Sequence, residues 1–113
     1  MLKRGLTKKE KDLITEFKRK VTQKLPGQIL GLKLFGSKAR GDSIKYSDID
    51  VLVVLKNASE KNINKVYDIA VRLELKYDIY KLSLKVWPKK KFDYLSGIPT
   101  VFMRTILEDA VNI

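Results

Sequence analysis

Residues 49–55, Ile-Asp-Val-Leu-Val-Val-Leu, restrict the fold of this chain more than any other stretch. The run is too short for a typical helix and is rich in β-branched residues, so it predicts a β-strand that is buried on both faces. A strand at the edge of a sheet, with one face in solvent, would carry more polar residues. We therefore expect residues 49–55 to lie inside a sheet.

Two aspartates stand at the start of this strand. Side chains alternate along a strand, so Asp48 and Asp50 point to the same side. Their Cα atoms would lie roughly 6.6 Å apart, and two charges at that distance repel by about 2.5 kcal/mol at an effective dielectric of about 20. A hard divalent cation that also binds substrate phosphates would relieve this repulsion, which favours Mg²⁺. The alternative is a charged strand end that faces solvent.

A glycine–serine turn precedes the aspartates. Residues 28–35 alternate loosely between apolar and polar and predict a first strand, which ends at Gly36 and Ser37. Gly36 lets a ligand approach the backbone closely, and Ser37 offers its hydroxyl and its amide at the start of a short helical turn. Together they favour phosphate binding, and an ordinary strand-to-helix turn is the alternative.

The order Gly36-Ser37, ten residues, Asp48-x-Asp50 resembles the signature of the DNA polymerase β-type nucleotidyltransferases, specifically the minimal nucleotidyltransferase (MNT) domains. The flanking patterns Gly-Ser-x-Ala-Arg-Gly and Ser-Asp-Ile-Asp strengthen the likeness. The resemblance implies that the two aspartates are catalytic and bind Mg²⁺, and that Gly36, Ser37 and Arg40 bind the phosphates of a nucleoside triphosphate such as ATP. It also implies an α/β (α+β) fold, a small mixed β-sheet flanked by helices.

Periodicity predicts the other elements and gives the order α, β, β, α, β, α. Helices are expected over residues 7–25, 60–77 and 100–110, and a third strand over residues 79–87. A capping-box pattern opens the first helix at residues 7 and 10, and Ser59 is the expected N-cap of the second. The expected core residues are Leu13, Ile14, Phe17, Val21, Leu25, Ile29, Leu32, Leu34, Ile63, Val66, Ala70, Leu73, Tyr77, Phe102, Met103, Ile106, Leu107 and Ala110.

The third strand lacks an acid that the resemblance leads us to expect. Nucleotidyltransferases usually carry a third carboxylate there, which completes the metal site and helps to take the proton from the attacking hydroxyl. Here Ser83 or Lys81 occupies that place, and Asp78 could substitute if the register of the strand slips or the strand begins earlier. A lysine is a poor base beside a metal unless its pKa is strongly lowered. Nucleotide binding can therefore survive while catalysis is slow, substrate-assisted or absent.

The net charge of +11 suits an anionic partner such as a nucleotide, a nucleic acid or an acidic protein surface. Lysine-rich solubilisation of a small domain is the alternative. Lys38 and Arg40 either steady phosphates or pair with Asp42 and Asp48. The lysine triplet at residues 89–91 opens a polar segment after Pro88 and is read as a solvated run of charge.

Composition excludes several classes of site. Cysteine and histidine are absent, which removes disulfides, thiol chemistry and the usual zinc ligands. A chain of 113 residues is expected to form one nucleotidyltransferase-like domain, residues 1–113. No apolar stretch is long enough for a signal peptide or a membrane span, so a cytoplasmic protein without a membrane partner is expected.

Two functions from different classes remain. The first is a minimal nucleotidyltransferase that moves a nucleoside monophosphate, AMP from Mg-ATP, to a hydroxyl on a protein or small acceptor. Short domains that resemble this family are often encoded beside a helical HEPN protein and act as its antitoxin, so the resemblance implies such a partner. The second is a module with this fold and impaired catalysis, which binds a partner protein, nucleotide or RNA.

Overall fold

The computed structural model of the chain describes residues 5–41 and 47–113. Its elements, in chain order, are α1 (Lys8–Lys24), β1 (Ile29–Phe35), α2 (Ser37–Arg40), β2 (Ile49–Leu55), α3 (Glu60–Tyr77), β3 (Leu82–Pro88), α4 (Lys89–Ser96), α5 (Val101–Asp109) and β4 (Val111–Asn112). The predicted order of the three long helices and three main strands is therefore confirmed.

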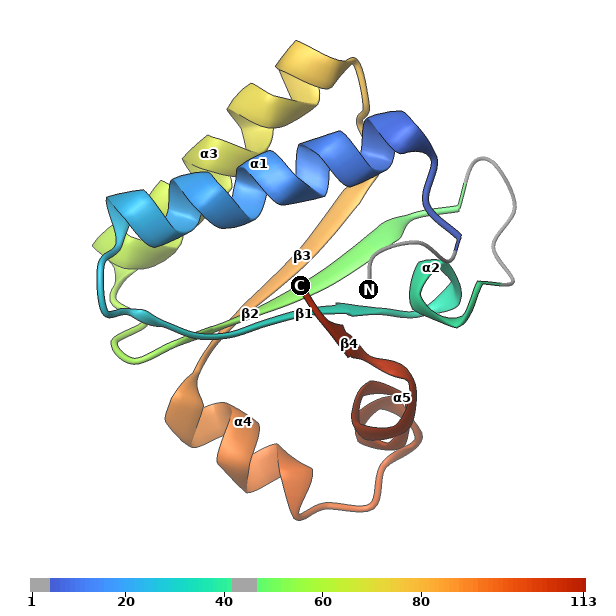
Figure 1. The fold of residues 1–113 in the computed structure, drawn as a ribbon. Coiled ribbons are helices and arrows are strands. Elements are labelled where there is room, and N and C mark those ends of the chain that lie inside the picture. The colour runs from blue at the N-terminus through green and yellow to red at the C-terminus, as the bar shows by residue number, and fades with distance from the viewer. Residues whose placement is uncertain (1–4, 42–46) are drawn as a thin grey trace.

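The strands form one mixed sheet in the order β3-β2-β1-β4. β1 runs antiparallel to β2 and to β4, whereas β2 and β3 are parallel. Helices α1 and α3 cover one face of the sheet, and α4 and α5 cover the other (Figure 1). This arrangement confirms the expected small mixed sheet flanked by helices.

The central strand β2 is buried on both of its faces, as predicted. Ile49, Val51, Val53 and Leu55 pack into the core beneath α1 and α3. Leu52 and Val54 pack on the opposite face, in a smaller cluster that is completed by Phe35, Trp87, Met103 and Ile106. Because alternate residues of a strand face opposite sides, Asp50 lies on the same face as Leu52, toward α4 and α5.

Local sequence signals define both long helices. The Thr7 hydroxyl accepts from the Glu10 amide at 3.1 Å and the Glu10 carboxylate accepts from the Thr7 amide at 3.0 Å, which confirms the capping box. Ser59 caps α3 through the amide of Asn62, also as predicted. Most of the predicted apolar residues of these helices are buried between them and the sheet.

Three predictions in the C-terminal third were wrong. β3 begins at Leu82 rather than at residue 79, and the segment expected to be polar after Pro88 is helix α4. Phe92 and Leu95 of α4 pack on the smaller cluster. This i, i+3 spacing of apolar residues is typical of a helix, but it follows a run of three lysines that predicts a polar segment. In α5 only Met103 and Ile106 are buried, while Phe102 is 38% exposed and Leu107 is 56% exposed, because this short helix contacts the sheet through one narrow face.

A cluster of charges around Glu16 joins α1 to α3. Lys76 Nζ donates to the Glu16 carboxylate at 2.8 Å and the Tyr77 hydroxyl donates to it at 2.7 Å. These two bonds lower the pKa of Glu16 to about 2. A carboxyl with a depressed pKa stabilises the fold above its ordinary value, and this contribution is lost as the pH falls toward the lowered one.

We therefore expect a Glu16→Gln variant to melt below the wild-type chain at pH 7, with the difference shrinking between pH 5 and pH 2. Circular dichroism melts across that range measure it. Asp68→Asn is the control, because Asp68 pairs with Arg72 on the exposed side of α3. A Tm difference for Glu16→Gln that stays constant with pH would contradict the assignment.

Among the described residues, no helix combines the length and the apolar character needed to cross a membrane.

Candidate functional site

The two aspartates lie where β2 begins, beside the end of β1. Asp50 is the second residue of β2 and pairs with Phe35, the last residue of β1. Its side chain is half-buried, whereas Asp48 is exposed. The two carboxylates are close enough for the charge of Asp48 to act on Asp50. The structure thus brings together the predicted pair at one end of the sheet.

The surroundings of Asp50 make ionisation of its carboxyl less favourable than in a free aspartate. Burial raises the pKa of the Asp50 carboxyl, and the neighbouring negative charge of Asp48 raises it further. Lys85, a hydrogen bond from Ser83 and the charge of Arg40 act in the opposite direction. A perturbed carboxylate beside another carboxylate is typical of a functional site rather than of a solvated strand end.

Gly36 holds the turn directly against Asp50. It precedes α2 with φ 75°, a conformation that favours glycine. A Cβ at Gly36 would lie 2.4 Å from Asp50 Oδ2, so only glycine fits here without a shift. Ser37 begins α2, as the sequence predicts, and the Gly36 carbonyl accepts from the amides of Ala39 and Arg40 at 3.1 Å. The turn and the aspartates therefore form one site.

Gly36→Ala is expected to destabilise the fold by about 2–3 kcal/mol and to displace the Asp50 carboxylate. Gly27→Ala is the matched control, because Gly27 has a similar φ of 73° and nothing lies within 4 Å of the added Cβ. We expect that control to cost about 1 kcal/mol, from backbone strain alone. Urea unfolding of both variants gives the difference, and equal costs would show that the Gly36–Asp50 contact is unimportant.

The two cations of α2, Lys38 and Arg40, contact different partners. Arg40 Nη1 lies 3.6 Å from Asp109 Oδ2 of α5, and its charge also reaches Asp50. Lys38 is buried, 1% exposed, and its Nζ donates to the Glu10 carboxylate. The Lys38 ammonium is therefore directed at Glu10, which corrects the prediction that it steadies phosphates, and among the described residues it forms no ion pair with Asp48. Asp42 lies outside the described residues.

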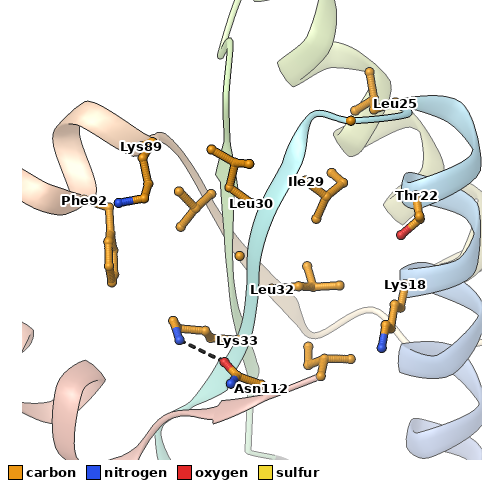
Figure 2. A pocket seen from close by; sticks show the side chains of 14 residues that line it. Lys18, Thr22, Leu25, Ile29, Leu30, Leu32, Lys33, Lys89, Phe92 and Asn112 are labelled. Carbon is orange, nitrogen blue, oxygen red and sulfur yellow. Dashed lines mark hydrogen bonds between the residues drawn. The ribbon is translucent and has the colours of Figure 1, made fainter.

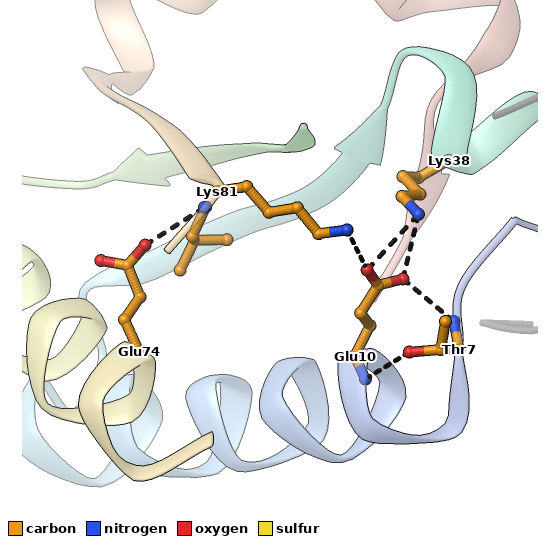
Figure 3. Close-up of polar contacts among 6 residues, drawn as sticks. Thr7, Glu10, Lys38, Glu74 and Lys81 are labelled. Carbon is orange, nitrogen blue, oxygen red and sulfur yellow. Dashed lines mark hydrogen bonds and ion pairs between the residues drawn. The ribbon is translucent and has the colours of Figure 1, made fainter. Parts of the chain in front are cut away.

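Glu10 joins α1 to α2 and to Lys81, the residue before β3 (Figure 3). Lys38 Nζ donates to its Oε1 at 3.1 Å, and Lys81 Nζ lies 2.7 Å from its Oε2. Burial works to raise the pKa of Glu10, but the bonds from Lys81, Thr7 and Lys38 hold it below its ordinary value. Sequence reasoning missed this network, because the capping box already accounted for Glu10.

Ser83 stands where the third carboxylate was expected. It pairs with Asp50 across the parallel strands β2 and β3, and the next residue on that face of β3 is Lys85. Asp78 does not substitute, because it caps the end of α3 with φ 55° and lies before β3 begins. Within the described residues, no three of the residue types that usually bind metals form a group.

An aromatic group borders the site on the α5 side. The Phe102 ring lies edge-on to Phe35 at 5.9 Å and to Trp87 at 6.0 Å between centroids. Lys85 Nζ lies 5.3 Å from the Phe102 ring centroid. The Lys85 ammonium therefore lies near this half-exposed ring, and its charge also acts on the carboxylate of Asp50.

The donor set fits a hard cation. The carboxylates of Asp48 and Asp50 and the hydroxyl of Ser83 are oxygen ligands, which suit Mg²⁺ better than they suit soft metals. The repulsion between Asp48 and Asp50 is the feature that a shared cation would relieve. Because the set is incomplete for octahedral coordination, phosphate oxygens and water would supply the remaining ligands.

Comparison with known proteins identifies the family. The sequence model of the nucleotidyltransferase domain family matches residues 14–109 of this chain. The chain belongs to this nucleotidyltransferase domain family. A proposed protein adenylyltransferase of Methanocaldococcus jannaschii is 39% identical to this nucleotidyltransferase domain over 100 residues, which cover 88% of the chain and 93% of that relative. Another from the same organism is 33% identical over 81 residues, or 69% of the chain, and the match spans only 55% of that relative.

Solved structures agree with this family. A proposed nucleotidyltransferase of Sulfolobus solfataricus matches this nucleotidyltransferase domain with a TM-score of 0.56 and 26% identity, over 89% of the chain and 76% of that protein. A chain of a toxin–antitoxin complex with AMP-PNP matches with a TM-score of 0.52 and 18% identity, over 86% of the chain and 69% of that protein. The second likeness concerns the fold alone.

Proposed function

We propose that this nucleotidyltransferase domain transfers AMP from ATP, with Mg²⁺, to a hydroxyl group of a partner protein. The observation that supports it best is the packing of Asp50 against the Gly36–Ser37 turn with Asp48 beside it. A pair of carboxylates beside such a turn supports the proposal, because a cation held by the carboxylates also takes phosphate oxygens as ligands.

The residues of the chain have distinct tasks in this proposal. Ser37 binds the triphosphate through its hydroxyl and amide, and Arg40 and Lys85 offset its negative charge. Asp48 and Asp50 would hold Mg²⁺, which supplies charge neutralisation at the phosphates when bound. The acceptor oxygen attacks the α-phosphorus, the bond to the bridging oxygen breaks, and pyrophosphate leaves while the hydroxyl proton passes to solvent.

The acceptor is proposed to be a tyrosine or other hydroxyl on a HEPN-type helical toxin, which makes this domain an antitoxin. The relatives described as protein adenylyltransferases and the fold shared with toxin–antitoxin complexes support this proposal. The net charge of +11 suits a partner with an acidic surface.

Incubation with α-labelled ATP, Mg²⁺ and the product of the neighbouring gene tests the proposal. Label is expected on the partner with the wild-type chain and not with Asp48→Ala. Omission of Mg²⁺ is expected to prevent labelling, and γ-labelled ATP is expected to leave the partner unlabelled, because the transferred group is the nucleoside monophosphate. Label from γ-labelled ATP would indicate phosphorylation instead and contradict the proposal.

A second candidate is a binding module with impaired catalysis, and Ser83 and Lys85 favour it. A serine cannot take the proton of the acceptor as a carboxylate can, and the ammonium of Lys85 is also unsuited to this task. In this case the domain forms a complex with its partner but no label is transferred. If RNA is the partner, affinity should fall steeply with salt and should not depend on the aspartates.

Ser83→Asp separates the two candidates. If the missing acid limits transfer, this variant is expected to label the partner about 100-fold faster than wild type or more, because general base catalysis contributes on that scale. Repulsion among three neighbouring carboxylates should also lower the Tm of this variant in the absence of Mg²⁺. Addition of Mg²⁺ should restore the Tm.

Ser83→Ala is the matched control and is expected to show neither effect. A Ser83→Asp variant that folds, responds to Mg²⁺ and still transfers no label would favour the binding module.

A further inference from the structure

A cavity of about 520 Å³ opens at the outer edge of β1, at the end of the sheet away from Asp50 (Figure 2). Helix α1 borders it on one side with Lys18 and Leu25, and α4 borders it on the other with Lys89 and Phe92. The residues of β1 from Ile29 to Lys33 run between the two helices. We call this cavity the β1-edge groove.

The backbone edge of β1 is only partly covered here. β4 pairs with β1 opposite Lys33 and Leu34, and the Ile113 amide donates to the Leu32 carbonyl at 2.9 Å. Next to residues 29–31, no strand lies on this side of β1 in the part of the chain that the structure describes. The Leu30 side chain is 49% exposed at this point. An open strand edge with an exposed apolar side chain can pair with another extended segment.

The charged side chains that line the groove are lysines. Lys18, Lys33 and Lys89 come from three different elements, and no described Asp or Glu side chain lines the groove. The Lys33 ammonium donates to Asn112 Oδ1 at 2.9 Å, and Lys89 pairs with Asp93 on the exposed side of α4. An acidic ligand would therefore meet complementary charge on both sides of the sheet edge.

We propose that the β1-edge groove binds an extended, acidic segment of a partner protein, laid along β1 in the line of β4. Successive side chains of such a segment point to opposite faces of the sheet. Carboxylates on one face reach Lys18, those on the other reach Lys33 and Lys89, and apolar side chains pack on Leu30 and Phe92. The aliphatic lining of the groove suits a peptide better than the sugar–phosphate chain of a nucleic acid.

This site is separate from the nucleotide site. Ile29 and Phe35 stand at opposite ends of β1, about 20 Å apart at the usual rise of a strand. The inference therefore does not depend on transfer chemistry, and binding can be measured without nucleotide. In a modifying enzyme the groove would dock the partner while the acceptor hydroxyl lies at Asp50.

A displayed library of random nonapeptides, selected on the intact chain without nucleotide, tests the proposal. We expect enriched peptides in which Asp or Glu alternates with apolar residues. For an enriched peptide, fluorescence anisotropy should give an affinity that falls by about 30-fold or more in the triple variant Lys18→Glu, Lys33→Glu, Lys89→Glu. The amide resonances of residues 29–33 and 112–113 should shift when the peptide binds.

The triple variant Lys9→Glu, Lys61→Glu, Lys65→Glu is the matched control. It makes the same change in net charge at positions outside the groove, and we expect it to lower the affinity by less than about 3-fold. Circular dichroism checks that both triple variants fold. The proposal is overturned if no acidic pattern is enriched, if both triple variants lose equal affinity, or if shifts occur elsewhere. Competition by poly(U) RNA or by unlabelled chain at the same resonances would also overturn it, in favour of nucleic acid or self-association.

Discussion

A chain that carries asparagine in place of Asp50 is expected to lose more than about 100-fold of its AMP-transfer rate, because one of the two proposed cation ligands is removed. The same variant is expected to melt about 2–5 °C higher than wild type at pH 7 without ligand. Burial and the charge of Asp48 raise the pKa of Asp50, so the ionised carboxylate opposes folding at neutral pH.

The sign of this effect can be checked with pH. A carboxyl whose pKa is higher in the folded chain than in the unfolded chain stabilises the fold only while it is protonated. This contribution is lost as the pH rises from the ordinary pKa through the raised one. The Tm advantage of Asp50→Asn should therefore be present at pH 7 and vanish below the ordinary aspartate value of 3.8. Asp48→Asn is the matched control, since Asp48 is exposed. We expect it to impair transfer with little direct change in Tm.

Thermal melts and label transfer on the same samples measure both effects. A variant that transfers AMP at the wild-type rate would remove Asp50 from the proposed site. A Tm that falls at pH 7 would instead indicate that this carboxylate is part of the structural framework.

Glu10→Gln is expected to destabilise the fold by about 3 kcal/mol or more, because it leaves the buried ammonium of Lys38 without a negative partner. Glutamine keeps the shape of the side chain and can still accept from the Thr7 amide, so the helix cap is preserved. Urea unfolding measures the loss. The turn at Gly36 and Ser37 should also become more mobile, because the ion pair between Lys38 and Glu10 holds α2 against α1.

The double variant Glu10→Gln, Lys38→Met separates the ion pair from other effects. Removal of both charges from a buried pair often costs little, so the double variant should recover most of the lost stability. Lys8→Met is a control for the loss of a lysine, since Lys8 pairs with Asp12 in an exposed position. A double variant no more stable than Glu10→Gln alone would contradict the importance of this pair.

The elements with strong local signals were predicted well from sequence. The apolar run of β2, the capping box at Thr7 and the N-cap at Ser59 specify their structures within a few residues, and all three lie where expected. Gly36 also lies against Asp50, which agrees with the resemblance that assigned the turn to the phosphates and the aspartates to the metal of one site.

Features that depend on tertiary contacts were not predicted. Lys38 follows the serine of the turn, and the sequence allowed it either to steady phosphates or to pair with Asp42 and Asp48. Its ammonium instead donates to a residue of α1 that is 28 positions away in sequence. Helix α4 was not predicted, because charged residues dominate its first turn and only Phe92 and Leu95 pack against the smaller cluster. Periodicity also overestimated the burial of α5, since it cannot tell how wide a face of the helix the sheet covers.

Calorimetric titration of ATP into the chain with Mg²⁺ present tests the central claim most directly. We expect binding at one site in the wild-type chain, with the heat lost in Asp50→Asn and strongly reduced when Mg²⁺ is omitted. Equal heats for the wild-type and Asp50→Asn chains, or none for either, would contradict a nucleotide site built from this aspartate pair and the adjoining turn.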